Sequence, residues 1–151
     1  MKKIEKIVIK REIDEDCDVS YYGSFDTKPW SELAIEHELN NSITFNYFNP
    51  ENCENEKQAR ENYERVISLD NGVWGMIGIR AEAMIMISLD GGEIWKFDTI
   101  SSGGLWGIED DDKEERLIEI ETEELNEVKK YLMELGFTKK EVEEAEVVED
   151  Y

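Results

Sequence analysis

The chain has 151 residues, of which 38 are acidic and 17 are lysine or arginine, so its formal net charge is −21. Such a surface repels phosphate, which disfavours direct binding of nucleic acid. The length and the 40% hydrophobic content favour one folded domain over residues 1–151 rather than a disordered chain. No apolar run approaches the roughly 20 residues of a membrane span, so we expect a cytoplasmic protein without membrane contact.

The first half of the chain predicts two strands separated by a loop. Residues 4–13 alternate apolar and charged side chains, which is typical of a strand with one buried face. Residues 14–29 predict a loop that is acidic at its start and contains Gly23 and Pro29. Residues 42–48 predict a short strand ended by Asn49-Pro50.

A helix is expected after these strands. Asn55 can cap its start, and Gln58 stands at the third helical position, as in a capping box. The helix is expected to run to about Leu69, after which Asn71-Gly72 predicts its end.

The strongest structural pattern is a long hairpin over residues 73–100. Isoleucine and alanine at every second position predict one face of a strand, and Trp74 with three methionines predicts the other. Because both faces are apolar, we expect a central strand covered on both sides near its end. Arg80 and Glu82 interrupt the second face and are expected to pair with neighbours where that face is wet. Asp90-Gly91-Gly92 predicts the turn, after which residues 93–100 return antiparallel.

The C-terminal part predicts two helices. Thr122 can cap the first, and Gly136 can end it. Thr138 and Glu141 form a capping box for a short second helix. Residues 117–120 fit either a strand or an early helical turn. The elements together predict an α+β fold with an antiparallel sheet, a long central hairpin, helices packed on the sheet and two C-terminal helices.

The reactive residue types are few. Cys17, Cys53 and His37 are too few for a structural zinc site, which takes four such ligands. We expect two reduced thiols and a surface histidine, because no nucleophile motif accompanies His37. No catalytic motif is found, so the prediction is a protein that is not an enzyme and has no cofactor.

Residues 101–112 join a glycine-rich loop to four consecutive acids. Glycine amides can form an anion-binding nest, but this loop lacks the Lys-Ser/Thr ending of a P-loop. The carboxylates suit Ca²⁺ or Mg²⁺, although consecutive side chains seldom converge on one ion, so no metal ligands are assigned. Three interpretations stay open: a partner-binding loop, a metal site, or a tight turn with Trp106 packed down and the acids solvated.

A second acidic segment comes earlier in the chain. It contains Asp14, Glu15, Asp16 and Asp18, and Tyr21 and Tyr22 follow closely. Acids beside aromatic residues suit a docking surface for a basic partner, since aromatics anchor interfaces and charges steer encounter. The alternative is a solvated loop whose aromatic residues fill the core.

Four stretches together resemble a family of small uncharacterised proteins from phages, prophages and related mobile elements. They are residues 16–23, residues 47–50, residues 62–65 with 78–83, and the Ser-Gly-Gly-Leu-Trp-Gly-Ile-Glu motif at 102–109. The resemblance extends over about residues 14–137 and implies a mobile-element setting but no chemistry. The family tends to have Ser-Asp-Ser where this chain has Asp110-Asp111-Asp112, which disfavours a mechanism that needs a hydroxyl there but not one that needs negative charge.

We therefore predict an acidic binding protein that inhibits a host nucleic-acid-handling defence system, such as a restriction or CRISPR effector, by occupying its basic surface as a nucleic-acid mimic. The predicted partner contacts are Trp106, Glu109, Asp110, Asp111, Asp112, Glu114, Glu115, Asp14, Glu15, Asp16 and Asp18. One alternative is a small-molecule or divalent-metal-binding protein that uses the loop at 103–106 and the adjacent acids. Another is acidity that serves only solubility, and an acid-catalysed hydrolase has no motif in its favour. The oligomeric state stays open.

Overall fold

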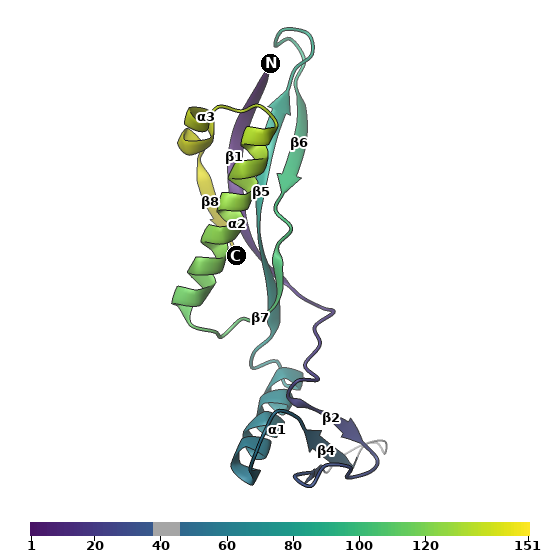
Figure 1. Ribbon diagram of the computed structural model, residues 1–151. Helices are drawn as coiled ribbons and strands as arrows, with labels where there is room; N and C mark the ends of the chain where they lie inside the picture. The colour runs from purple at the N-terminus through teal and green to yellow at the C-terminus, as the bar shows by residue number, and fades with distance from the viewer. Residues whose placement is uncertain (38–45) are drawn as a thin grey trace. The chain divides into compact units, whose positions relative to one another are not determined.

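The computed structural model describes residues 1–37 and 46–151, so most of the strand predicted over 42–48 lies outside the described residues. The chain forms two compact units (Figure 1), and each is described by itself. The first unit comprises Met1–Glu15 and Met76–Tyr151, and the second comprises Asp16–Gly75. No described helix is long and apolar enough to cross a membrane.

The first unit contains a five-stranded sheet centred on β5 (Met76–Ile87). On one side, β1 (Lys2–Ile13) pairs antiparallel with β5. On the other side, β6 (Lys96–Ser101) and β7 (Leu105–Glu109) pair antiparallel with successive parts of β5. At the outer edge of β1, β8 (Val147–Asp150) runs parallel to it. The sheet is therefore mixed, and the prediction of a purely antiparallel sheet is wrong, although the α+β class and the long hairpin are confirmed.

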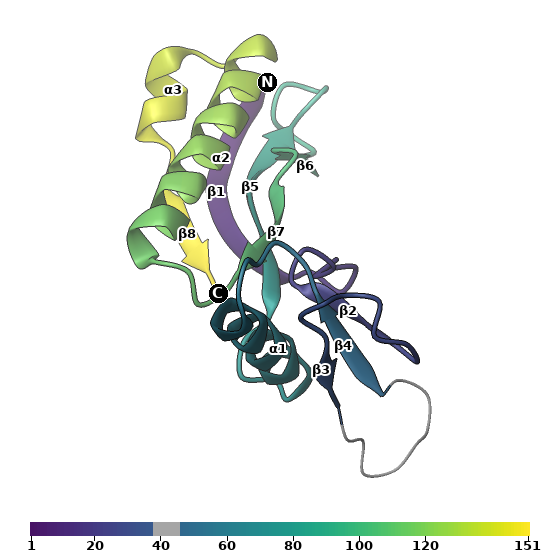
Figure 2. The same cartoon turned by 60° about the horizontal axis from the view of Figure 1, so that its bottom comes forward.

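One face of this sheet carries the main core. Two helices pack on it, α2 (Glu114–Glu134) and α3 (Lys139–Glu144), and they lie beside each other in both views (Figures 1 and 2). The pairing of β1 with β5 sets apolar residues opposite small ones on this face, which leaves room for α2. No helix in the described part of this unit lies over the opposite face. That face is covered near the start of β5, where Met76 is buried and the Trp106 ring lies over Gly78, so cover on both sides is confirmed at that end of the strand only. The buried cluster consists of Ile7, Ala81, Ala83, Ile85, Val128, Leu132, Phe137 and Val142.

The helix α2 begins eight residues before the predicted cap, at Glu114 instead of after Thr122. The Thr122 hydroxyl donates to the carbonyl of Ile118 inside the helix, so it caps nothing. Leu117 and Ile120 are helical and buried against the sheet, which settles the ambiguity over residues 117–120. The predicted end at Gly136, which has φ 94°, is confirmed, as is the capping box of α3.

The second unit is a small α+β module. Its sheet has the antiparallel order β2-β4-β3, formed by β2 (Gly23–Asp26), β4 (Tyr47–Pro50) and β3 (Ile35–Glu36). The helix α1 (Glu56–Asp70) contacts β4 and β3. The loop predicted over 14–29 therefore contains a strand, and Asn49-Pro50 are the last residues of a strand rather than its terminator. Gly23 accommodates close backbone contact with Asn49, where a side chain would overlap.

The start of α1 is close to the prediction. The Asn55 side chain accepts a hydrogen bond from the Gln58 amide at 2.9 Å, which confirms the cap. The Gln58 side chain accepts from the amide of Glu54, one residue earlier than a capping box requires. At the other end, Asn71 is the C-cap, as predicted.

The second unit also contains His37, Trp74 and the two cysteines, for which the sequence made separate predictions. His37 is half-buried rather than a surface residue: its Nδ1 lies 2.5 Å from the Tyr63 hydroxyl, and its ring packs beside Phe25. Trp74 is buried in this unit and donates to the carbonyl of Arg65, so it does not continue a face of β5. The two cysteines are both free and half-buried.

Candidate partner-binding surface

The glycine loop between β6 and β7 is occupied by the protein's own carboxylates. The Gly104 amide donates to the Glu124 side chain at 3.0 Å, and the Gly103 amide donates to Glu127 at 3.3 Å. Both glutamates come from α2, and Glu124 is buried. The amides that an anion nest would use therefore bind α2, which fixes the loop against the helix.

Trp106 is packed down, as the tight-turn interpretation expects. Its ring lies directly over Gly78, where a Cβ atom would overlap the ring. The next residue, Gly107, has φ 71° and donates its amide to Asp14 Oδ2 at 2.9 Å. The glycine-tryptophan motif thus holds β7 to the sheet. The ring remains about half exposed, so a contact with a partner stays a prediction.

Several of the predicted partner-binding acids have internal partners. Asp112 pairs with Arg116 at 2.9 Å, and Glu114 pairs with Arg11 at 2.8 Å. Glu109 ends β7 opposite Met76 and is half-buried. The remaining members of this run, Asp110, Asp111 and Glu115, are exposed.

The earlier acidic segment is divided between the two units. Asp14 and Glu15 belong to the first unit, in which Asp14 accepts the Gly107 amide. Asp16 and Asp18 belong to the second unit. Asp18 accepts a hydrogen bond from the Ser20 amide, which lowers the pKa of its carboxyl group. Asp14 and Asp18 therefore have local structural roles.

The exposed side of α2 carries a row of glutamates, of which sequence analysis included only Glu115. Glu115, Glu119 and Glu123 are four residues apart and exposed, and we call them the acidic stripe. Four residues of helix rise about 6 Å, so the stripe presents carboxylates at that spacing. No ion pair to any of the three occurs in residues 1–37 and 46–151. The spacing is visible in the sequence, but the late helix start predicted at Thr122 concealed it.

The Arg11 side chain of β1 forms ion pairs with glutamates on the side of α2 that faces the sheet. Arg11 Nε lies 2.6 Å from Glu121, whose side chain is only 5% exposed, and its Nη2 contacts Glu114. The guanidinium also lies 4.1 Å from the centre of the Tyr151 ring. Burial opposes the charge of Arg11, but the hydrogen bonds to both glutamates outweigh burial and raise its pKa. Glu114 and Glu121 on this side of the helix thus share one cation, whereas no ion pair to the stripe occurs in the described residues.

On the opposite face of the sheet, ionic residues of β1 and β5 form a network. Arg80 contacts Glu12 at 2.8 Å and Glu82 at 2.7 Å, and Lys10 contacts Glu82 at 3.1 Å. Hydrogen bonds from Arg80 are the main reason that the pKa values of Glu12 and Glu82 are lowered. The prediction that Arg80 and Glu82 pair with neighbours on a partly wet face is confirmed.

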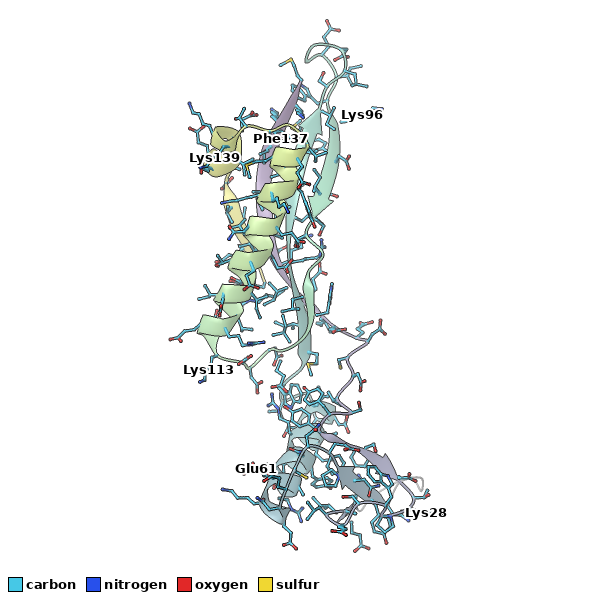
Figure 3. The ribbon with its side chains drawn as sticks, in the orientation of Figure 1. Lys28, Glu61, Lys96, Lys113, Phe137 and Lys139 are labelled. Atoms are coloured by element: carbon cyan, nitrogen blue, oxygen red, sulfur yellow. The ribbon has the colours of Figure 1, made fainter. Side chains whose placement is uncertain are left out.

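The described ranges contain no group of three or more His, Cys, Asp or Glu side chains placed to hold a metal ion. Comparisons with protein-family models, with curated proteins and with solved structures found no match to this chain. The functional argument therefore depends on side-chain geometry. The helix that carries the acidic stripe, α2, extends along the first unit from Lys113 toward Phe137 (Figure 3).

Proposed function

We propose that the chain is an acidic binding protein that inhibits a host nucleic-acid-handling defence enzyme by occupying its basic surface. The acidic stripe, with Asp110 and Asp111 just before α2, supplies the contact. The resemblance to phage and mobile-element proteins provides the setting, and the fixed array of carboxylates on a helix provides the means of imitating nucleic-acid charge.

The observation that carries this proposal is that the three carboxylates of the acidic stripe repel one another and form no ion pair with the described residues. Like charges four residues apart on a helix each destabilise it by about 0.2–0.5 kcal/mol. Neither Glu115 nor Glu123 has a cation three or four residues away, and the nearby Arg116 is paired with Asp112. A cationic partner would relieve this repulsion, so binding to a basic surface would lower the electrostatic free energy of the helix.

The alternative small-ligand function receives no comparable support. It depends on the glycine loop, whose Gly103 and Gly104 amides are hydrogen-bonded to Glu127 and Glu124. A ligand there would first have to displace two carboxylates. We therefore place the functional surface on the outside of α2 rather than at this loop.

The test is affinity capture from a host lysate with three forms of the chain. These are the wild type, a stripe variant with E115Q, E119Q and E123Q, and a charge-matched control with E32Q, E61Q and E64Q, all of which are exposed residues. Bound proteins are washed at low and then high salt and identified by mass spectrometry. We expect the wild type and the control to retain a nuclease or effector subunit that leaves as salt rises, and the stripe variant to lose it.

Two results would contradict the proposal. Equal retention by the stripe variant would show that these glutamates do not form the contact. Equal loss from the stripe variant and the control would show that total charge matters and position does not, as expected for acidity that serves solubility.

A further inference from the structure

The turn between β5 and β6 displays apolar side chains that nothing in its own unit covers. We define the hairpin tip as residues 1–6 and 86–99. Leu89 is 92% exposed, and Ile94 and Phe97 are each 67% exposed. A pocket of about 460 Å³ lies between Ile87, Leu89 and Ile94, with Lys96 and Asp98 also lining it. A cluster of exposed large apolar residues marks an interaction site more often than a free surface.

The tip is held in one conformation by its own hydrogen bonds. One oxygen of the Asp90 carboxylate accepts from the Ser88 hydroxyl at 2.8 Å and from the amides of Glu93 and Ile94 at 3.0 and 2.9 Å. The Trp95 indole donates to the carbonyl of Gly92 at 3.1 Å. The apolar side chains therefore project from an ordered turn, which reduces the entropy lost when they bind.

The tip is also electrically neutral in a strongly acidic chain. It contains four lysines and four acids, so its net charge is 4 − 4 = 0, and the rest of the sequence carries the whole −21. When two copies of this chain approach through their tips, the residues that meet therefore carry no net charge. The eight charged residues are Lys2, Lys3, Lys6, Lys96, Glu5, Asp90, Glu93 and Asp98.

The arrangement of the first unit keeps the acidic stripe away from the tip. Lys96 at the tip and Lys113 just before α2 lie at opposite ends of this unit (Figure 3). The 21 residues of α2 extend over about 31 Å. The Debye length at physiological salt is about 8 Å, so repulsion between stripes is screened when two copies meet at their tips.

We propose that the hairpin tip is the docking site for a second copy of the chain, in a two-fold symmetric dimer. Leu89, Ile94 and Phe97 of each copy pack against the other copy. Side chains alternate along β6, so Lys96 and Asp98 project from the opposite side of the strand to Phe97 and place no unpaired like charge beside its ring. Both acidic stripes stay accessible in this dimer.

The test is sedimentation velocity of the full chain over a range of concentrations, at low and high salt. We expect a concentration-dependent change from one copy to two that persists or strengthens at high salt, because the interface is apolar and the residual repulsion is screened. L89D and F97D should each raise the dimer dissociation constant by at least about tenfold. The control I118D changes an exposed apolar residue of α2 in the same way and should leave dimerisation unchanged.

Melting temperatures of the variants verify folding, which exposed positions 89 and 97 should not disturb. A wild-type chain that stays a single copy at all concentrations would overturn the proposal. So would a dimer that withstands L89D and F97D but is lost in I118D. The chain could also stay a single copy and bind vesicles of neutral and anionic phospholipids, with binding abolished by L89D. That result would overturn the dimer and show that the tip binds a membrane.

Discussion

Replacing Arg11 with methionine tests how α2 is fixed to the sheet. The guanidinium lies 2.6 Å from Glu121 and 2.8 Å from Glu114, and its side chain is mostly buried. R11M keeps most of the volume of the side chain but removes the cation. Glu121, at 5% exposure, would then be a buried carboxylate without its ion-pair partner.

The expected loss follows from the burial of Glu121, since Glu114 is exposed. Leaving one member of a buried ion pair alone costs about 3–5 kcal/mol, whereas the exposed Glu114 contact contributes at most about 1 kcal/mol. For a chain of this length, such a loss lowers the melting temperature by about 6–20 °C. The double variant R11M/E121M removes both charges and should recover most of the loss, because apolar residues replace buried pairs at little cost.

The assay is urea unfolding followed by far-ultraviolet circular dichroism, since α2 is the longest helix of the described chain. A loss below about 1 kcal/mol in R11M, or a double variant no more stable than R11M, would refute this account of how α2 is held.

Three further predictions concern other positions. G78A should destabilise the first unit by about 1–3 kcal/mol and shift the tryptophan fluorescence, because a methyl group displaces the Trp106 ring. N55A should cost about 0.5–2 kcal/mol in urea unfolding, because the Gln58 amide loses its acceptor. The pKa of Glu82 is lowered from 4.5 by Arg80, so its stabilising effect is present above pH 4.5 and is lost as the pH falls through its folded-state value. The stability difference between the wild type and R80M should therefore shrink below pH 4.5, and a difference that stays constant would contradict this linkage.

The sequence predicted best where a local pattern determines the structure. Alternation of apolar residues predicted β1 and β5, the Asp90 turn predicted the hairpin, and helix caps were found at Asn55 and Thr138. In each case neighbouring residues supply the hydrogen bonds or the buried face, so no distant contact is needed. For Trp106, one of the three interpretations left open, the tight turn with the ring packed on the sheet, agrees with its position over Gly78.

Distant contacts account for the features that were missed. The short strand β8 ends in Glu149 and Asp150 and has no apolar alternation, so only its pairing with β1 makes it a strand. Thr122 resembles a helix cap, but the acids before it favour an earlier helix start through the helix dipole. That early start also makes the acidic stripe continuous, which is why the stripe was only partly included among the predicted contacts.

The amides of the glycine loop illustrate the same limit for the candidate site. Glycines 103 and 104 suggest an anion nest, but their donors bind Glu124 and Glu127 from a helix twenty or more residues later in the chain. Nothing in the local sequence distinguishes an internal carboxylate from an external anion. The sequence shows that α2 is rich in acids. It does not show which of these acids face inward, because that depends on how the helix packs on the sheet.

The central claim is that the acidic stripe occupies a surface that otherwise binds nucleic acid. Its most direct test is competition between duplex DNA and this chain for a protein recovered by the capture experiment. We predict that the wild type displaces the DNA, and that the variant with E115Q, E119Q and E123Q is about tenfold weaker, because three exposed ionic contacts are worth about 0.5 kcal/mol each. A partner that holds DNA and this chain at the same time, or a stripe variant that displaces DNA as well as the wild type does, would contradict the claim.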